Sequence, residues 1–466
     1  MPKRQNQNKQ SSFTKKSQSK NVKEFELINP NPAGIDIGAS EHWVSVPAER
    51  DCENVRRFGC FTPDLNQIAD WLKQCGVTTV AMESTGVYWI PLFQILEENG
   101  FEVRLVNAHY IKTVPGRKSD VLDCQWIQKL HSYGLLSGSF RPDDEICVLR
   151  SYIRQRDNLI RSSSVHVLRM QKALSQMNLQ LHQVLSDITG VTGLKILRAI
   201  MNGERDPKIL ATMRDCRVKS SVAEIEKALS GDYRAEHIFV LQQELYLYEI
   251  YRTQIQQCDI QIEEYLASLE DKSQHTKPLP PQNRAKKPKG NAPKFDLRSH
   301  LYRITGVDFT SIDGMGVLTV QTLISEVGLD PSRFPTAKHF ASWLGLCPGS
   351  RISGGKVLSS KTRTVVNRAA TALRVAAQSV ASSKSAIGAF YRRKKAQLGA
   401  PKAITATAHK LARIFYHLWK YGESYVDPGA DYYQQKYKER AVRNLKKTAK
   451  SLGLDVVEQP TVQEVS

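Results

Sequence analysis

The 466-residue sequence lacks the features that define several common classes of protein. No run approaches the ~18 apolar residues that a membrane-spanning helix needs. The eight cysteines include no Cys-x-x-Cys pair, which argues against a zinc ribbon and against a disulfide framework. The basic N-terminus has no apolar segment of the kind found in a secretory signal. We therefore expect a protein of the reducing cytoplasm that makes no membrane contact.

Acidic residues are also few. Lys and Arg number 66 against 46 Asp and Glu, which gives a formal net charge of +20. Such an excess predicts a polyanionic partner, most simply nucleic acid. A basic soluble protein of another kind, such as a ribosome-like one, is the alternative that charge alone leaves open. Residues 1–28 are predicted to form a disordered basic arm that adds phosphate contacts, or a solvated tail without a role.

Strand and helix signals alternate through residues 29–145. Strands are predicted at 34–37, 43–46, 57–61, 78–82 and 102–106, and helices at 65–75, 87–99 and 119–131. An early strand hairpin followed by alternation predicts a mixed sheet with helices on both faces, which is the order of ribonuclease-H-like folds. The first region is therefore predicted to be an α/β domain.

The remainder of the chain is predicted to be mainly helical. Apolar residues in heptad register run from Ile146 to Val184, broken only by Arg156 and Ser163, and again from Ile238 to Leu269. This pattern predicts a helical coiled-coil domain at 146–270 that serves dimerisation and spacing, or one helical subdomain that packs on itself. The segments that follow are predicted to be a Lys/Pro-rich linker at 271–298, a helical domain at 299–425 and a basic tail at 426–466.

Four acids in the first domain stand out by position. Asp36 lies within a predicted strand, in "AGIDIGASEHWVSVP", and Glu83 lies at the exit of another, in "VTTVAMESTG". Asp120 and Asp123, in "RKSDVLDCQWI", share one face at the start of a predicted helix. Carboxylates so placed repel one another unless a cation joins them, and Mg²⁺ prefers such oxygen ligands. The four acids therefore indicate a metal site for phosphoryl transfer.

Other interpretations of these acids stay open. Asp120 could cap its helix, Asp123 could be a solvated first-turn acid and Glu83 an ordinary turn residue. An actin- or hexokinase-type ATPase also begins with a strand hairpin, but it needs a second glycine-rich phosphate loop, and "IDGMGVLT" lacks the glycine run. A DnaQ-type exonuclease needs Asp-x-Glu in its first strand, whereas position 38 is Gly38.

Two motifs in the second half suit contact with a phosphate. "TSIDGMGVLTVQTLISEVG" resembles a helix-hairpin-helix, in which Gly314 and Gly316 present backbone N–H groups to DNA; a plain interhelical turn is the alternative. Ser353 precedes two glycines in what is predicted to be a flexible loop. A serine hydroxyl there becomes a nucleophile only if a metal or base activates it. The cations around it are candidates for nucleic-acid contact: Arg351, Lys356, Lys361, Arg363 and Arg368.

Several segments in one order carry a resemblance to a known family. They are "GIDIGASEHWVSV", "AMESTGVYW", "VNAHYIKTVPGRKSDVLDCQWI", "IDGMG", "ASWLGLCPGSRISGGK" and "AITATAHKLARIFYHLW". Together, from about residue 32 to about residue 425, they resemble the DEDD insertion-sequence transposases of the insertion-sequence 110 family, which are bridge-RNA-guided recombinases. The long linker, the N-terminal arm and the C-terminal tail depart from the family pattern.

The resemblance implies a fold and a set of functional residues. It implies a RuvC-like domain at 29–145, then the coiled coil and a C-terminal transposase domain. The family's metal-binding tetrad falls on Asp36, Glu83, Asp120 and Asp123. Its nucleophilic serine falls on Ser353, with Ser350 as the alternative. The expected cofactor is Mg²⁺, or alternatively Mn²⁺.

The resemblance also implies partners and an activity. The partners are donor and target DNA, a noncoding bridge RNA and further copies of the chain in a dimer or tetramer. The expected location is the cytoplasm of a bacterium, in association with the nucleoid. The predicted function is a transposase that cuts and rejoins DNA through a serine. The alternatives are a RuvC-type junction endonuclease that uses water, and a non-catalytic nucleic-acid-binding scaffold.

Overall fold

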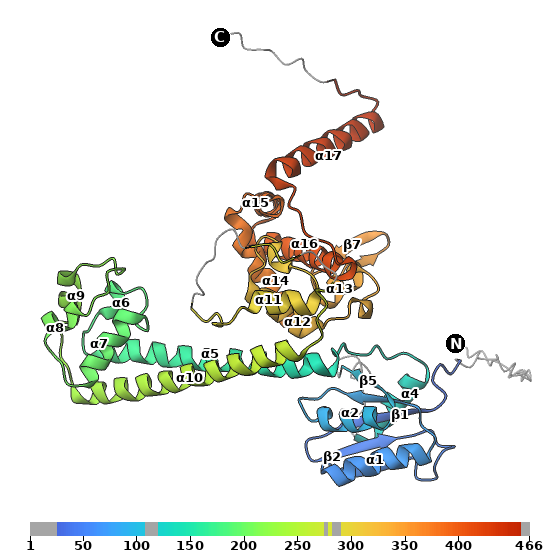
Figure 1. Ribbon diagram of the computed structural model, residues 1–466. Coiled ribbons are helices and arrows are strands. Elements are labelled where there is room, and N and C mark those ends of the chain that lie inside the picture. The colour runs from blue at the N-terminus through green and yellow to red at the C-terminus, as the bar shows by residue number, and fades with distance from the viewer. Residues whose placement is uncertain (1–25, 108–119, 275–277, 282–289, 458–466) are drawn as a thin grey trace, which may run out of the picture. The chain divides into compact units, whose positions relative to one another are not determined.

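The computed structural model describes residues 26–107, 120–274, 278–281 and 290–457 (Figure 1). The chain divides into two compact units, residues 1–141 and residues 142–466. Most of the predicted N-terminal arm lies outside the described residues. In the part of the chain that is described, no helix is both long and apolar enough to cross a membrane.

The first unit is built on a five-stranded mixed sheet with the strand order β3-β2-β1-β4-β5. The strands are β1 (Pro32–Ile37), β2 (Glu41–Ser45), β3 (Val55–Gly59), β4 (Thr79–Glu83) and β5 (Glu102–Val106). The first three form an antiparallel meander, whereas β4 runs parallel to β1 and β5 runs parallel to β4. The predicted mixed sheet is confirmed, with strand boundaries that differ by no more than a few residues.

Helices cover both faces of this sheet, as predicted. They are α1 (Thr62–Gln74), α2 (Trp89–Glu98) and α4 (Asp120–Ser132). Side chains alternate between faces along a strand. On one face Ile35 and Met82 belong to the core formed with α1 and α2. On the other face Ala81 and Val106 pack against Ile127 of α4.

The second unit contains two long helices that pack against each other, α5 (Asp144–Gln176) and α10 (Ala235–Ser268). Tyr265 donates a hydrogen bond to the Glu145 carbonyl, and His166 contacts Glu244, so the two helices run antiparallel. The buried positions of α10 are those that the heptad pattern predicts: Leu241, Leu245, Tyr248, Ile255, Ile262 and Leu266. The prediction that the first helix continues to residue 184 is wrong, because α5 ends at Gln176 and the chain turns through Asn178, which has a φ of 55°.

Short helices join the far ends of this pair, a subdomain that the sequence pattern did not indicate. They are α6 (Leu181–Val184), α7 (Val191–Met201), α8 (Pro207–Thr212) and α9 (Val222–Leu229). Their apolar side chains share one core with the ends of α5 and α10. Each helix is too short to be stable alone, so this shared core holds the subdomain together.

The C-terminal part is helical apart from one two-stranded hairpin. Its elements are α11 (Leu297–Thr305), η1 (Phe309–Ser311), α12 (Val317–Val327), η2 (Pro331–Arg333), α13 (Ala337–Trp343), β6 (Arg351–Ser353), β7 (Lys356–Ser359), α14 (Arg368–Ser379), η3 (Val380–Ser382), α15 (Ala386–Leu398), α16 (Ala400–Tyr421) and α17 (Gly429–Ser451). Aromatic rings build its core: the ring centroids of Phe309 and Phe415 are 4.4 Å apart, and those of Phe340 and Phe415 are 6.0 Å apart.

Candidate functional site

Two carboxylates lie on neighbouring parallel strands of the first unit, at the same height along the sheet. Ile35 of β1 pairs with Met82 of β4, so the next residues along, Asp36 and Glu83, come level with each other. Neighbouring strands are about 4.8 Å apart, and side chains at one level of a parallel pair share a face. Glu83 is 4% exposed and accepts a hydrogen bond of 2.9 Å from the Thr85 hydroxyl. Asp36 is half-buried.

Helix α4 lies directly on the face that carries these acids. A Cβ added to Gly34 of β1 would lie 2.2 Å from the backbone nitrogen of Gln128 and 2.4 Å from the carbonyl oxygen of Cys124. Only glycine permits so close an approach of helix and strand. Asp36 is two residues beyond Gly34, so it faces the same helix.

The direction of α4 brings its first turn to the acidic end of the sheet. The Thr79 hydroxyl, at the start of β4, lies 2.9 Å from Nε2 of His131 in the last turn of α4. The helix therefore runs opposite to β4. Glu83 is the last residue of β4, so it lies at the same end of the sheet as the beginning of α4. Asp120 and Asp123 belong to that first part of α4.

The Cys124 thiol reports on the charge in this region. Burial, with a smaller contribution from the negative charges of Asp36 and Asp123, raises the pKa of Cys124 to about 12. Both carboxylates therefore lie near this buried thiol. The structure thus brings Asp36, Glu83 and Asp123 to one end of the sheet. Asp120 is the first residue of α4, and its side chain lies outside the described residues.

These acids have the donor chemistry that a hard divalent cation requires, since Mg²⁺ takes carboxylate oxygens. Among the side chains that the structure describes, which do not include that of Asp120, no three His, Cys, Asp or Glu side chains lie close enough together to hold a metal ion. The fourth acid of the predicted tetrad belongs to the helix terminus at the same end of the sheet. The residues therefore suit a divalent metal in their kind, and they lie at one end of the sheet.

Ser353 lies at the tip of a tight hairpin rather than in the predicted flexible loop. It ends β6 and pairs with Lys356, the first residue of β7. Gly354 and Gly355 make the two-residue connection with φ of 53° and 77°, the backbone that a type I′ turn needs. Ser353 and Lys356 are both exposed. The sequence signal for this hairpin was the Gly-Gly pair between two short strand-like runs. Ser350, the alternative nucleophile, is exposed and lies just before β6.

The predicted cation set around Ser353 separates into two groups. Arg351, Lys356 and Lys361 are exposed. Arg363 instead donates hydrogen bonds to the carbonyl and hydroxyl oxygens of Ser342, and Arg368 pairs with Asp157 at 3.2 Å. The first group is therefore free to meet a phosphate, whereas Arg363 and Arg368 also contribute to the fold.

The predicted helix-hairpin-helix segment forms the turn that leads into α12. Gly314 has a φ of 83°, and a Cβ there would lie 2.6 Å from the Ala376 carbonyl oxygen of α14. Gly316 is the N-cap of α12, and no side chain accepts a hydrogen bond from the first turn of this helix. A shallow cavity of about 470 Å³ lies over the turn. The Met315 N–H of this turn already donates to the Ile312 carbonyl at 3.0 Å. The start of α12 stays a candidate for phosphate contact, because helix N-termini can bind anions.

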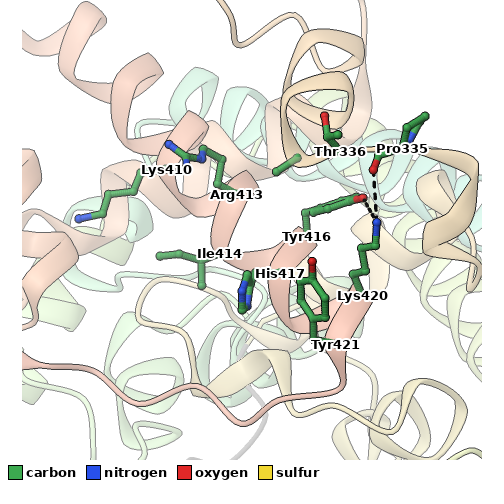
Figure 2. Close-up of a pocket in the computed structure, with 10 residues that line it drawn as sticks. Pro335, Thr336, Lys410, Arg413, Ile414, Tyr416, His417, Lys420 and Tyr421 are labelled. Atoms are coloured by element: carbon green, nitrogen blue, oxygen red, sulfur yellow. Dashed lines mark hydrogen bonds between the residues drawn. The ribbon is translucent and has the colours of Figure 1, made fainter.

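A basic groove along α16 was not singled out from the sequence. Its cavity of about 500 Å³ is lined by cations and rings of this helix (Figure 2). Lys420 Nζ donates to the Pro335 carbonyl at 3.3 Å and to the Tyr416 hydroxyl at 3.4 Å. In the described part of the chain no carboxylate pairs with Arg413 or Lys420. The 3-4-3 spacing of Lys410, Arg413, His417 and Lys420 could have revealed this basic face.

Comparison with known protein families identifies the class of the protein. A family model described as Transposase, for DEDD enzymes of the IS110 type, matches residues 33–179. A second model, described as Transposase IS116/IS110/IS902 family, matches residues 308–392. Both models place the chain among the transposases. No curated protein matches the sequence.

The chain belongs to the DEDD transposases of the IS110 family, as the sequence motifs predicted. The first match contains Asp36, Glu83, Asp120 and Asp123, and the second contains Ser353. Residues 393–466, which include the last part of α15 and all of α16 and α17, lie outside both matches.

Proposed function

We propose that the protein is a recombinase of an insertion sequence that cuts and rejoins DNA through Ser353 with the help of a divalent metal. The observation that carries the proposal is the position of Asp36 and Glu83, which directly follow the paired residues Ile35 and Met82 on adjacent parallel strands, with Asp123 of α4 at the same end of the sheet. The strand order and these acids support a RuvC-like fold for the first unit.

Asp36, Glu83, Asp120 and Asp123 would hold Mg²⁺, or alternatively Mn²⁺. When bound, the metal would polarise the scissile phosphate and lower the pKa of an attacking hydroxyl. Burial of Glu83 and close packing of α4 on Gly34 keep these carboxylates in place. Such fixed positions matter because a displacement of about 1 Å can slow a reaction about a hundredfold.

Ser353 would supply the nucleophile. Its Oγ would form a bond to phosphorus, the hydroxyl proton would pass to water, and the bond from phosphorus to the leaving strand oxygen would break. That oxygen would take up a proton, and the phosphoserine would conserve the ester bond for rejoining. Lys356, which pairs with Ser353 across the hairpin, would place an ammonium group beside the phosphate. The positive φ of Gly354 and Gly355 holds the serine at the exposed tip.

The expected partners belong to the same proposal. A guide RNA is supported by the net charge of +20 and by the resemblance to bridge-RNA-guided recombinases. Assembly with further copies of the chain is supported by large apolar side chains that α10 leaves exposed, among them Phe239, Tyr246 and Ile260. These side chains would be covered where two copies meet through the long helices.

Metal-dependent cleavage of DNA that carries the ends of the element tests the proposal. We expect Asp36→Asn and Glu83→Gln to lower cleavage by about a hundredfold or more, because outer-shell changes alone reduce metal-dependent activity 10–100-fold. DNA binding in EDTA should be unchanged. Asp70→Asn, which removes an exposed acid of α1, is the matched control and should cleave normally.

Three results would contradict the proposal. Full cleavage by both acid variants would show that these carboxylates hold no essential metal. Cleavage that depends on the acids but is unaffected by Ser353→Ala and Ser350→Ala would indicate a RuvC-type endonuclease that uses water. DNA binding without any cleavage, under all metals tested, would indicate a scaffold.

A further inference from the structure

Helix α17 lies beyond both segments that match the transposase family models, which end at residue 392. Over its 23 residues, seven are Lys or Arg and two are Asp or Glu. The sequence predicted only a basic tail at 426–466, without a role. The distribution of its charges around the helix indicates one.

Five of the cations form a single stripe, defined here as the α17 stripe: Lys436, Arg440, Arg443, Lys447 and Lys450. Their spacing of 4, 3, 4 and 3 residues puts them on one face of the helix. At 1.5 Å per residue the stripe is about 21 Å long. All five side chains are exposed. Of the two remaining cations, Lys438 lies on the opposite face of the helix, whereas Lys446 borders the stripe because it is three residues from Arg443 and four from Lys450.

The first part of α17 is attached to the neighbouring helices through Tyr433 and Tyr437, which lie beside Lys436 and Arg440 on the surface of the helix. The rings of Tyr433 and Phe390 of α15 meet at 6.1 Å, edge to face, and Arg393 of α15 lies over the Tyr437 ring. Lys410 of α16 lies 5.2 Å from the Tyr433 ring. These contacts hold the first part of the helix, and all five side chains of the stripe remain exposed.

The second part of α17 gains little from apolar packing. Residues 443–448 are all exposed, and Ala449 is the only residue of the helix, which is described throughout, that is buried. Helices of this kind are normally stabilised by packing of an apolar face. Like charges three or four residues apart destabilise a helix by about 0.2–0.5 kcal/mol per pair.

Among the described residues, one carboxylate pairs with the stripe. Glu439 pairs with Lys436 at 3.1 Å, and no other described carboxylate pairs with the remaining four members. The helix dipole favours cations only in the last turn, which accounts for Lys450. The positions of Arg440, Arg443 and Lys447 remain to be explained, and an external polyanion along the stripe explains them.

We propose that α17 is a DNA-docking helix that lies along duplex DNA through the α17 stripe; this inference rests on the proposed DNA recombinase function. A helix with side chains is about 10–12 Å across, and the major groove of B-form DNA is about 12 Å wide. The major groove of duplex RNA is too narrow and deep to admit it. A membrane surface is disfavoured because such helices need a broad apolar face opposite the cations, and α17 has none.

The test compares two single variants of the full-length protein that each remove one positive charge from α17. Arg443→Gln removes a member of the stripe, and Lys438→Gln removes the cation on the opposite face of the helix. Binding to a 30-base-pair DNA duplex is measured in EDTA between 50 and 200 mM salt, together with binding to duplex RNA of the same sequence and to anionic vesicles. Circular dichroism checks that both variants keep their helix content.

We expect the stripe variant to lower the slope of log K against log salt by about 0.9, the contribution of one phosphate contact. The control should change the slope by less than about 0.5, a bound set by the loss of general charge without a contact. Equal losses in both variants would refute the inference, as would a loss confined to RNA or to vesicles. Because EDTA removes divalent metal and prevents cleavage, the binding result is independent of the metal site. At saturating DNA and with Mg²⁺, the stripe variant should still cleave. If the unaltered protein binds DNA through the stripe but does not cleave it, the proposed recombinase function is wrong and the docking helix is not.

Discussion

Replacing Gly34 by Ala tests the packing that positions the acidic site. The added Cβ would lie 2.2 Å from a backbone nitrogen of α4, and the gap must open by about 0.8 Å to reach even a tight contact of 3.0 Å. The obstructing atoms belong to the helix backbone, so no side-chain rotation relieves the overlap. Overpacking of this kind costs about 1–3 kcal/mol. We expect the melting temperature of the first unit to fall by on the order of 5–10 °C.

Gly34→Ala should lower the rate of DNA cleavage by more than its loss of stability alone would cause. Moving α4 away from β1 separates Asp120 and Asp123 from Asp36, and a displacement of about 1 Å at a reacting centre can cost about a hundredfold in rate. Urea unfolding gives the loss of stability, and cleavage well below the melting temperature gives the loss of activity. Titration with Mg²⁺ should show weaker apparent metal affinity.

Gly138→Ala is the matched control for this experiment. Its Cβ would have no heavy atom nearer than 4.0 Å, and Gly138 does not have a positive φ. We expect its stability to stay within about 0.5 kcal/mol of the unaltered protein and its cleavage to be normal. If Gly34→Ala behaves like this control in both assays, α4 does not lie on β1 as described, and the account of the acidic site is wrong.

Three further predictions follow from individual contacts. Arg156 is 4% exposed and pairs with Asp259 at 2.5 Å. Asp259→Ala leaves this buried guanidinium without its carboxylate, so it should lower the free energy of unfolding by about 3–5 kcal/mol. Urea unfolding measures the change. Burial lowers the pKa of His131 to about 4, so the unfolded chain takes up a proton below about pH 6.5 that the folded one does not. Stability should therefore fall from pH 6.5 to pH 4 by up to about 1.4 kcal/mol per pH unit, and His131→Gln should remove that part of the slope. Gly354→Val should slow the reaction of Ser353 with DNA by distorting the turn, at a cost of about 1–2 kcal/mol to the hairpin.

Each of these has its own control or contrary result. Replacing Arg156 and Asp259 together by Leu should recover most of the stability, and failure to do so would show that the contact between them is not what matters. Identical pH slopes with and without His131 would contradict its buried, neutral state. Gly453→Val removes another glycine of positive φ with no neighbour within 4 Å, and it should leave the reaction of Ser353 unchanged.

The sequence predicted the sheet because its strands are local and strongly apolar. The acids were also accessible to prediction, since Asp36 interrupts an aliphatic strand and Glu83 ends another. Their alignment in register was not predicted, because strand pairing depends on distant contacts. The contact of Gly34 with α4 was equally hidden, since a single glycine has no pattern that shows what approaches it.

In the second half, periodicity predicted which residues of α10 are buried but not where α5 ends. The heptad pattern continues past Gln176, whereas the chain turns at Asn178 so that Leu181 and its neighbours can fill the core of the short helices. The hairpin of Ser353 was taken for a loop, because β6 and β7 are short and their side chains are exposed on both faces.

The most direct test of the central claim is to find the residue that becomes linked to DNA. The protein is incubated with Mg²⁺ and element-end DNA, and with RNA transcribed from the element. The complex is then denatured and digested with nuclease and trypsin, and its peptides are weighed by mass spectrometry. Trypsin cuts after Arg351 and Lys356, so Ser353 lies in the peptide 352–356, apart from Ser350. We expect a nucleotide on peptide 352–356 of the unaltered protein and none on that peptide of Asp36→Asn. Cleaved DNA with no nucleotide on that peptide would contradict the central claim.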